Sequence, residues 1–289
     1  MAKVLVTGGC GFIGSNLTDE LIERGYEVDV VDNLSTGKME NLNPSAEFHM
    51  DDITKESFWY KVRGESYEYI FHTAALARIQ PSIEHPVKSH EVNVNGTLNV
   101  LEYCRENPTK LIFSGSSSVF SGEEVPAKED SPKLARNPYS LNKLINEQYI
   151  DLYVSLYGLK AVTLRYFSVY GERQLLEGAY RTVIGIFLNQ KAIGEPLQIT
   201  GDGEQRRDFT YVGDVVKANV MAMDWEGDFN IGAGENYSIN EIAELFDHPI
   251  EYVDKAPGEV RDTLADNTKA GLEGWHPSTN VKEWISENT

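Results

Sequence analysis

The chain has 289 residues, which is enough for one large domain or two small ones with buried cores. Its 45 acidic residues outnumber its 26 basic residues and give a formal charge of −19, which opposes binding to nucleic acid or to an anionic membrane. The two cysteines, Cys10 and Cys104, do not suggest a disulfide framework, and the histidines lack metal-ligand spacing, so we expect neither a disulfide nor a metal site. No apolar run reaches the roughly 18 residues of a membrane span, and the N-terminus has no signal-peptide core, which favours a soluble, cytoplasmic protein.

The first residues predict a strand, a glycine-rich turn, a helix and a second strand in immediate succession. Residues 3–7 are an apolar run that leads into a turn at 8–14, and helical periodicity follows over 15–24. The second strand, 27–31, ends at Asp32. Glycines let a backbone approach a pyrophosphate, a helix N-terminus attracts its charge, and an acid after the second strand suits a ribose diol. The unit therefore favours a dinucleotide site over a tight turn without a ligand. Asp32 would repel the 2′-phosphate of NADP, so NAD is the preferred cofactor.

Strand and helix patterns continue to alternate beyond this unit. Strands are predicted at residues 69–72, 111–114 and 161–165, and helices at 94–105 and 139–157. Repeated strand–helix units of this kind indicate an α/β fold with a parallel, doubly wound sheet.

The pattern loosens after residue 171, which predicts a second, smaller α+β lobe for the substrate. We expect residues 1–171 and 209–225 to form the cofactor-binding domain, with 209–225 returning to the sheet. Residues 172–208 and 226–289 would form the second lobe.

A tyrosine and a lysine lie four residues apart at the start of the helix predicted for residues 139–157. Asn137 and Pro138 fit a helix N-cap and the first helical residue, which places Tyr139 and Lys143 on one face. A cation about 4 Å from the phenol, helped by the helix start, would lower the phenol pKa from about 10 towards neutrality. The pair is then a proton acceptor; the alternative is a solvated pair of neighbours without a chemical role.

Eight groups of residues, including the glycine-rich turn and the Tyr139–Lys143 pair, occur in order and carry a resemblance to a known family. They are TGGCGFIG at residues 7–14, DNLSTG at 32–37, HTAA at 72–75, NVNGT at 93–97, SGSSSV at 114–119, Tyr139 with Lys143, LRYF at 164–167, and GDG at 201–203 with RDF at 207–209. The chain resembles an extended short-chain dehydrogenase/reductase of the NAD-dependent epimerase/dehydratase family, and within it a UDP-hexose 4-epimerase. The resemblance covers nearly the whole chain. It implies a Rossmann domain for tightly bound NAD and a C-terminal lobe for a UDP-sugar.

The resemblance implies a catalytic set of Ser116, Tyr139 and Lys143. Tyr139 as phenolate would take the proton of the 4-hydroxyl while hydride passes to the nicotinamide. Lys143 would lower the Tyr139 pKa and hold the nicotinamide ribose, and Ser116 would bind the reacting oxygen. The keto-sugar would turn over and take hydride back on its other face, so NAD stays bound. The matching cofactor positions are Gly8, Gly11, Phe12, Ile13, Gly14, Asp32, Asn33, Asp52, Ile53, Ala74, Lys143 and Phe167. Without these partners, Ser116 is equally a strand-end serine and Asp52 a loop acid.

The resemblance also implies a site for the UDP-sugar. Arg207 matches the family arginine that meets the diphosphate, and Arg206 and Arg173 are expected beside it as a basic cluster. An exposed basic pair without a ligand is the alternative for Arg206 and Arg207. The expected substrate contacts are Ser117, Ser118, Ser168, Val183, Gln198, Thr200, Arg207, Arg261 and Thr263.

Several positions depart from the family pattern. Ser168 stands where the family has Asn, and Ala256 where it has Arg, for which Arg261 would compensate. Thr263 occupies a position where Tyr restricts the site to plain hexoses, and this smaller residue favours tolerance of UDP-N-acetylglucosamine as well as UDP-glucose.

Ser117 and Ser118 separate the enzyme classes. Related dehydratases and decarboxylases carry an acid at these positions, so the serines favour a 4-epimerase, an isomerase of carbohydrate metabolism. The alternatives are another nucleotide-sugar modifier, such as a dehydratase or reductase, and a non-catalytic NAD-binding sensor. The resemblance further implies a homodimer through helices 94–105 and 139–157, whose extra apolar residues would otherwise pack against the protein's own sheet.

Overall fold

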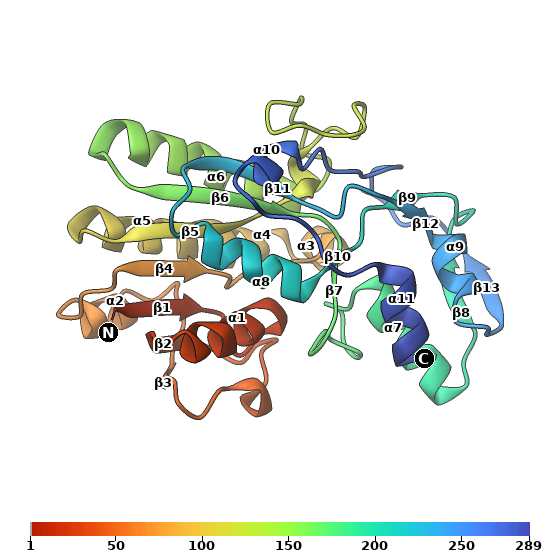
Figure 1. Cartoon of the computed structure of the whole chain (residues 1–289), viewed down its shortest axis with the longest axis horizontal. Coiled ribbons are helices and arrows are strands. Elements are labelled where there is room, and N and C mark those ends of the chain that lie inside the picture. Colours follow the sequence, from red (N-terminus) through yellow and green to blue (C-terminus); the bar gives the residue numbers. More distant parts are fainter. Residues whose placement is uncertain (1) are drawn as a thin grey trace.

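Seven parallel strands form the centre of the structure, a computed structural model that describes residues 2–289 (Figure 1). In spatial order the strands are β11 (Gly227–Ile231), β6 (Ala161–Tyr166), β5 (Lys110–Ser116), β4 (Tyr69–His72), β1 (Lys3–Thr7), β2 (Glu27–Asp32) and β3 (Glu47–Met50). The order reverses between β1 and β4, which is the switch point where open α/β sheets bind ligands. The predicted α/β, doubly wound Rossmann architecture is therefore confirmed.

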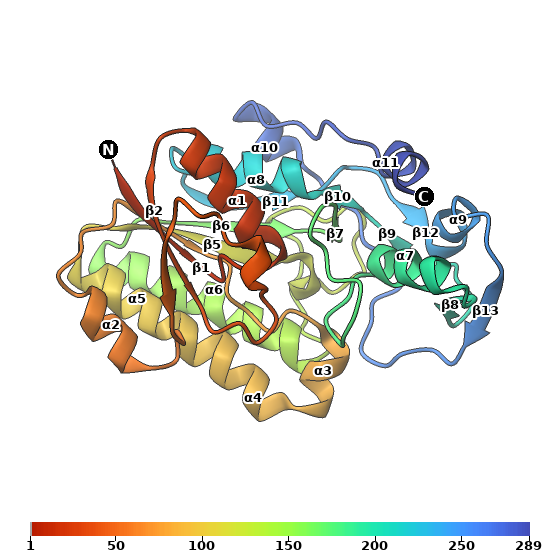
Figure 2. The same ribbon diagram turned by 90° about the horizontal axis from the view of Figure 1, so that it is seen from below.

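Helices cover both faces of this sheet (Figure 2). One face carries α1 (Phe12–Glu23), α8 (Val212–Met221) and α10 (Thr268–Leu272), and the other carries α2 (Glu56–Val62), α5 (Gly96–Glu106) and α6 (Pro138–Tyr157). Side chains alternate between the two cores: Val4 and Val6 of β1 belong to one and Leu5 to the other. Burial on both faces explains why the strands are nearly continuous apolar runs. The short segments between them are η1 (Met39–Asn41), α3 (Ile79–Glu84), α4 (Pro86–His90), the π-helical turn η2 (Glu91–Asn95) and η3 (Ser117–Val119).

The start of α6 follows from its sequence. Asn137 lies just outside the helix with extended backbone, and its side chain accepts a hydrogen bond of 2.8 Å from the Ser140 amide. Pro138 is the first helical residue, where a missing N–H costs nothing, and Gly158 ends the helix in the left-handed conformation with φ of 69°. The helix predicted for residues 139–157 is confirmed, and its cap fixes where Tyr139 and Lys143 point.

A second core lies beyond the carboxyl ends of the sheet, at the right of Figure 1. Its large side chains include Phe187, Phe246 and Ile285. It is built from α7 (Val183–Ile193), α9 (Ile239–Glu244), α11 (Val281–Asn288) and the paired strands β8 (Leu197–Thr200) and β13 (Ile250–Val253). Two smaller strand pairs join it to the sheet domain: β7 (Val169–Tyr170) with β10 (Thr210–Tyr211), and β9 (Arg206–Arg207) with β12 (Tyr237–Ser238).

The expected boundary at residue 226 does not match the strand pairing. Residues 226–289 were assigned to the second lobe, but β11 pairs in parallel with β6 and forms the edge of the central sheet. Ala270 and Trp275 also pack into the sheet's core, with Trp275 fully buried. Residues 210–211, expected in the main sheet, form β10, which pairs with β7 in a separate two-stranded sheet. The chain therefore returns to the central sheet after residue 226 and adds the edge strand β11, which its weak C-terminal pattern did not predict.

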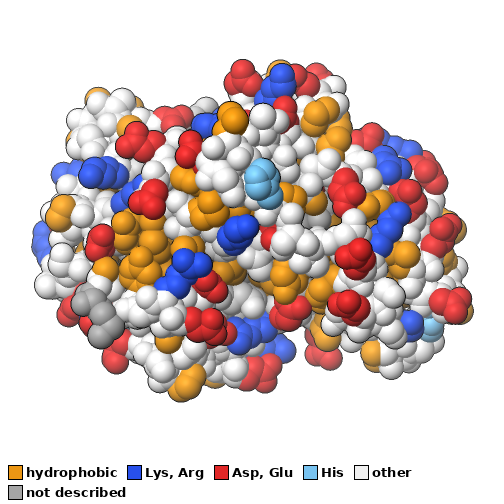
Figure 3. All heavy atoms as spheres, viewed as in Figure 1, with side chains coloured by type: hydrophobic (Ala, Val, Ile, Leu, Met, Phe, Trp, Pro, Cys, Tyr) orange, Lys and Arg blue, Asp and Glu red, His pale blue; other side chains and the backbone are white. Residues whose placement is uncertain are grey.

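The surface carries the charge seen in the sequence. On the face shown in Figure 3, acidic side chains are spread over both parts of the molecule, with basic side chains between them. Within residues 2–289, none of the helices combines the length and the apolar character that crossing a membrane requires. Cys10 and Cys104 are both buried and free.

Candidate active site

A cavity of about 630 Å³ lies at the carboxyl ends of the strands and extends towards the second core. It brings together residues of α1, β2, β5, α6 and α7, and of the turns after β1 and β4, that are far apart in sequence. The predicted site residues that line it are Gly8, Gly11, Phe12, Ile13, Gly14, Asp32, Asn33, Asp52, Ile53, Ala74, Ser116, Ser117, Ser118, Tyr139, Lys143, Phe167, Ser168, Val183, Gln198, Thr200, Arg207 and Thr263. A cavity of this size with a few converging polar groups is typical of a small-molecule site.

The glycine-rich turn forms one end of this cavity and fits a dinucleotide pyrophosphate. Gly8 has φ of +73°, and a Cβ on Gly14 would lie 2.3 Å from the Gly8 carbonyl oxygen. Only glycine at these two positions allows the chain to fold this tightly against the start of α1. The first residues of α1 line the cavity there, so a phosphate can approach the N-terminus of the helix.

Acidic side chains at the end of β2 and just after β3 form the end of the cavity that suits an adenosine. Asp32 accepts hydrogen bonds from the Cys10 and Leu34 amides, and burial raises its pKa although these two bonds act against it. Asn33 donates to the Asp52 carboxylate at 2.8 Å. The carboxylate of Asp32 is therefore held rigidly at the end of β2, where a ribose diol can donate to it. These residues fit NAD.

Ser116, Tyr139 and Lys143 lie together in the middle of the cavity. Lys143 is 4% exposed; its Nζ donates to the Ser114 carbonyl oxygen at 2.6 Å and lies 4.8 Å from the centre of the Phe113 ring. Ser116 donates to the Ser118 hydroxyl at 2.9 Å and accepts from the Ser118 amide. The arrangement places a phenol, a hydroxyl and an ammonium at the carboxyl end of β5.

The pKa values in this group differ from the sequence-based expectation. Burial raises the pKa of Tyr139, while a hydrogen bond with Ser116 and the positive charge of Arg78 act in the opposite direction. Burial also lowers the pKa of Lys143 to about 8, although the negative charge of Glu147 partly opposes this. The expected net lowering of the Tyr139 pKa by Lys143 is therefore not found, because desolvation of the phenol outweighs the nearby charge. The cation that acts on Tyr139 is Arg78.

Arg207 lies where a diphosphate site was expected, but with a partner. Its Nη2 pairs with Glu259 at 3.0 Å, and its Nη1 donates to the carbonyl oxygens of Arg206 and Arg261. The expected basic cluster around it is not found. Arg206 pairs with Glu241 at 3.0 Å, and Arg173 pairs with Asp19 of α1 at 2.6 Å. Neither of them lines the cavity. Arg206 points away because adjacent residues on a strand face opposite sides, and Arg173 is held by its pair with α1.

Arg261 does not reach the cavity, so its predicted substrate contact is corrected. Its side chain is exposed and pairs with Asp202 at 2.9 Å. Thr263 does line the cavity, and its hydroxyl accepts a hydrogen bond from the Asp208 amide. The segment that carries these residues is tied to the catalytic helix, since Asn137 Nδ2 donates to the Gly258 carbonyl oxygen at 2.9 Å.

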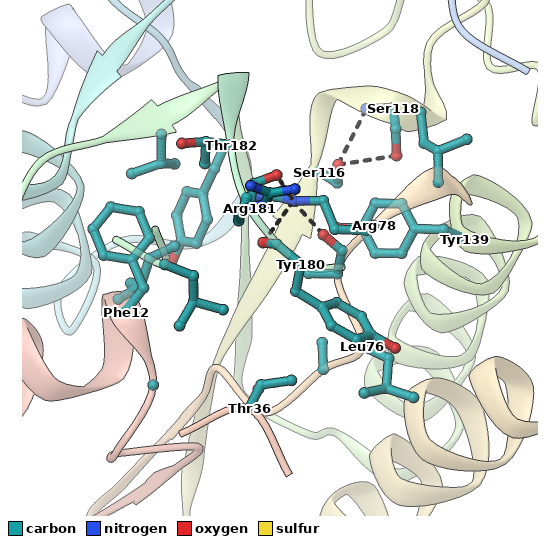
Figure 4. A pocket seen from close by; sticks show the side chains of 18 of the residues that line it. Phe12, Thr36, Leu76, Arg78, Ser116, Ser118, Tyr139, Tyr180, Arg181 and Thr182 are labelled. Carbon is teal, nitrogen blue, oxygen red and sulfur yellow. Dashed lines mark hydrogen bonds between the residues drawn. The ribbon is translucent and has the colours of Figure 1, made fainter. Parts of the chain in front are cut away.

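Arg78 and Arg181 are cavity residues that the sequence analysis missed (Figure 4). Arg78 follows the strand–loop motif at residues 72–75 by three residues, and Arg181 precedes α7 by two. A single arginine in a loop belongs to no sequence pattern. The one available signal was that each arginine lies within a few residues of a predicted site residue.

Searches against known proteins agree on the kind of molecule. The model of the NAD dependent epimerase/dehydratase family matches residues 4–232. A protein of Methanocaldococcus jannaschii, provisionally named UDP-glucose 4-epimerase, is 41% identical and covers 98% of this chain and 95% of its own length. The crystal structure of UDP-glucose 4-epimerase from Thermotoga maritima with UDP-glucose superimposes with a TM-score of 0.94 at 38% identity, covering 98% of this chain and 96% of that one. The UDP-N-acetylglucosamine 4-epimerase of Methanobrevibacter ruminantium, in complex with UDP-N-acetylmuramic acid, gives 0.92 at 35% identity, covering 99% and 96%.

Proposed function

Because the chain belongs to the NAD dependent epimerase/dehydratase family, we propose that it inverts carbon 4 of a UDP-linked hexose or N-acetylhexosamine. The observation that carries this proposal is the position of Ser116, Tyr139 and Lys143 in one cavity with the glycine-rich turn. NAD would supply a hydride acceptor and donor at that carbon. The lining residues run from the end of β2 to α7, so a dinucleotide at one end and a nucleotide sugar at the other would meet at this catalytic set.

Tyr139 is the proposed proton acceptor for the 4-hydroxyl. Its phenol is desolvated, which opposes ionisation, and the charge of Arg78 and the hydrogen bond with Ser116 favour the anion. When the hydroxyl has lost its proton and carbon 4 its hydride, Ser116 would donate to the resulting carbonyl oxygen after leaving its bond to Ser118. Lys143 donates a hydrogen bond to the Ser114 carbonyl oxygen and stays positively charged beside the reacting groups at pH values under about 8. Inversion requires that the keto-sugar turn over before hydride returns.

We assign the UDP moiety to the end of the cavity that lies beside the second core. Val183, Gln198 and Thr200 line the cavity there, and Arg207 supplies a planar cation for the diphosphate. The pair between Arg207 and Glu259 would open or be shared when the diphosphate arrives. The small side chain of Thr263 leaves space beside the sugar, which supports tolerance of an N-acetyl group.

Serines in place of acids support an epimerase rather than a dehydratase. Ser117 and Ser118 line the cavity beside Ser116, and neither can act as the additional acid that elimination of water needs. A second candidate function, reduction of a keto-sugar, would require a stoichiometric supply of reduced cofactor. No feature of the cavity favours it over epimerisation.

The test is to incubate the purified protein separately with UDP-glucose and UDP-N-acetylglucosamine without added cofactor. The anomeric protons, followed by NMR, are expected to show conversion to the galacto forms until equilibrium is reached. The Tyr139→Phe variant is the matched control, because it removes only the phenolic oxygen. Failure to interconvert either sugar, or any other UDP-hexose, would contradict the proposal, and a dependence on added NADH would favour a reductase.

The second part of this proposal is a homodimer through α5 and α6. An apolar stripe runs along α6 at Leu141, Leu152 and Leu156, whose side chains are 48%, 46% and 62% exposed. The spacing of these residues places them on one side of the helix, as an interhelical contact requires. Light scattering after size exclusion is expected to give twice the chain mass, and Leu152→Glu to give a monomer. Leu272→Glu, on the remote helix α10, is the control, and a monomeric wild type would contradict this part.

A further inference from the structure

Residues 174–182 form a loop without helix or strand that closes one side of the cavity, and we call this loop the strap. Its two ends are joined, because the Thr182 hydroxyl donates to Gln174 Oε1 at 2.8 Å. Thr182 is also the N-cap of α7, so the strap continues directly into the second core. The residues between its ends that line the cavity are Leu175, Ala179, Tyr180 and Arg181.

The chain just before the strap is tied to α1, the helix that begins at the glycine-rich turn. Arg173 pairs with Asp19 of α1 at 2.6 Å. Asn16 Nδ2 donates to the Glu172 carbonyl oxygen at 3.1 Å and to the Phe12 carbonyl oxygen in the first turn of the helix. Arg173 has φ of 64°, a conformation that residues other than glycine rarely adopt and that surrounding contacts must maintain. The ion pair with Asp19 therefore helps to fix a disfavoured backbone conformation at the start of the strap.

The other end of the strap is tied to the loop after β4. Arg78 Nε donates to the carbonyl oxygens of Tyr180 and Arg181, each at 2.9 Å, and Figure 4 shows the guanidinium at these two carbonyls. Hydrogen bonds from a charged donor are stronger than those between neutral groups. Arg78 lies four residues after Ala74, a predicted cofactor contact. The strap is thus attached to the sheet domain at both ends, although its chain leads into the second core.

These two attachments lie on either side of the switch point of the sheet. The helix α1 follows β1, the loop with Arg78 follows β4, and the strands β1 and β4 are neighbours in the sheet. In open α/β sheets, the ligand crevice lies between the connections that leave two such strands. A loop that is tied to both connections therefore crosses the crevice in which the glycine-rich turn favours a dinucleotide.

We propose that the strap retains NAD throughout the catalytic cycle. The proposal rests on the proposed function, in which hydride passes to the cofactor and returns from it while the cofactor stays in place. Departure of the reduced cofactor between these steps would leave the keto-sugar without its hydride. The ties to α1 and to Arg78 have to open before the cofactor can leave across the switch point. Gln198 and Arg207, at the UDP end of the cavity, lie outside the strap, so a sugar nucleotide would exchange while the ties stay closed.

The ion pair between Arg173 and Asp19 provides the first test, because neither side chain lines the cavity. The holoenzyme is loaded with radiolabelled NAD, and loss of the label is followed in excess unlabelled NAD without any sugar. Asp19→Lys and Arg173→Glu are each expected to release the label about 3- to 10-fold faster, since reversal of one charge turns a partly exposed attraction into a repulsion. The double variant restores a pair of reversed polarity and is expected to return towards the wild-type rate.

The signs of these effects separate the strap from a general effect of charge on the cofactor. A direct effect of charge on the NAD phosphates would make Asp19→Lys slow the release and Arg173→Glu accelerate it, and this result would overturn the proposal. Arg24→Glu is the matched control, because it breaks an exposed ion pair with Glu20 on the same helix and is expected to leave the rate unchanged.

Proteolysis of the cofactor-free protein provides the second test. A glutamate-specific protease is expected to cleave after Glu177, an exposed residue of the strap, about 10-fold faster in Arg78→Met, because cleavage follows the population of the opened loop. An Arg78→Met variant that releases NAD faster without faster cleavage would show that Arg78 holds the cofactor directly, and would overturn the tie. If Arg78→Met does not fold, cleavage and release in the Asp19 and Arg173 variants still decide.

The release assay contains no sugar, so its result is independent of the test of the proposed function. If the ion-pair variants release NAD at the wild-type rate while the wild type epimerises UDP-sugars, the strap proposal is wrong and the proposed function stands. If no UDP-sugar is epimerised by a wild type that retains NAD, the proposed function itself is wrong.

Discussion

Replacement of Lys143 by Met is expected to stabilise the protein at neutral pH while it destroys the site. The ammonium is 4% exposed, and burial lowers its pKa from 10.5 to about 8. This depression means that the folded state binds the proton less tightly than the unfolded state does. A difference of that size corresponds to about 3 kcal/mol of destabilisation at any pH below 8. Met has a similar length and no charge, so the variant escapes this cost.

The variant also loses an interaction, which gives the prediction a characteristic pH dependence. The Ser114 carbonyl oxygen would no longer receive the 2.6 Å hydrogen bond from Nζ, a loss of about 1–2 kcal/mol. At pH 7 the variant is then more stable than the wild type by about 1–2 kcal/mol. Between pH 8 and pH 10.5 only the unfolded wild type still binds the proton, so the stability of the wild type rises relative to the variant. By about pH 10 the difference should have shrunk by 2–3 kcal/mol and reached zero or reversed.

Urea unfolding of cofactor-free protein, followed by tryptophan fluorescence at several pH values, measures this difference. Lys217→Met, at an exposed position of α8, is the matched control for the loss of a lysine. A Lys143→Met variant that is less stable than the wild type by the same amount at pH 7 and pH 10 would refute the reasoning. In that case Lys143 would be a stabilising residue rather than one retained for its chemistry.

Three further predictions concern the cavity. Tyr139→Phe should abolish epimerisation and leave co-purified NAD in place, as judged by absorbance after denaturation; residual activity near the wild-type level would exclude Tyr139 as the proton acceptor. Gly14→Ala should abolish NAD retention, because its Cβ would lie 2.3 Å from a backbone carbonyl oxygen of the same turn, whereas Gly64→Ala, with open space around it, should retain NAD. Glu259→Gln should tighten UDP binding in calorimetry by releasing Arg207, and weaker binding would show that Glu259 orients the arginine instead.

Local signals in the sequence were sufficient where the structure depends on local chemistry. Asn137 and Pro138 predict the start of α6 because a cap and a proline act within one turn. The turn after β1 is predictable for the same reason, since only glycine tolerates the conformation at residue 8 and the close approach at residue 14. These two elements supply Tyr139, Lys143 and the glycine-rich end of the cavity.

Predictions failed where side-chain direction or long-range pairing decides. Arg206 and Arg207 are neighbours in sequence, yet only Arg207 faces the cavity, because β9 turns the other side chain towards Glu241. The short strand β11 follows a loop with no clear pattern, and only its pairing with β6 makes it part of the sheet. The net direction of the Tyr139 pKa depends on burial, which has no signature in a sequence.

The two ends of the Asn137 amide have different tasks. Its oxygen caps α6 and its nitrogen holds the carbonyl of Gly258, in the segment that also carries Glu259 and Thr263. Displacement of that segment by an arriving ligand is therefore transmitted through a single side chain to the turn that positions Tyr139. Such coupling is reciprocal, so whatever fixes the first turn of α6 also favours one arrangement of the segment. Asn137→Asp would keep the oxygen that caps α6 and remove the N–H that holds the Gly258 carbonyl. In that variant, movement of the segment on ligand entry would no longer be transmitted to the turn that positions Tyr139.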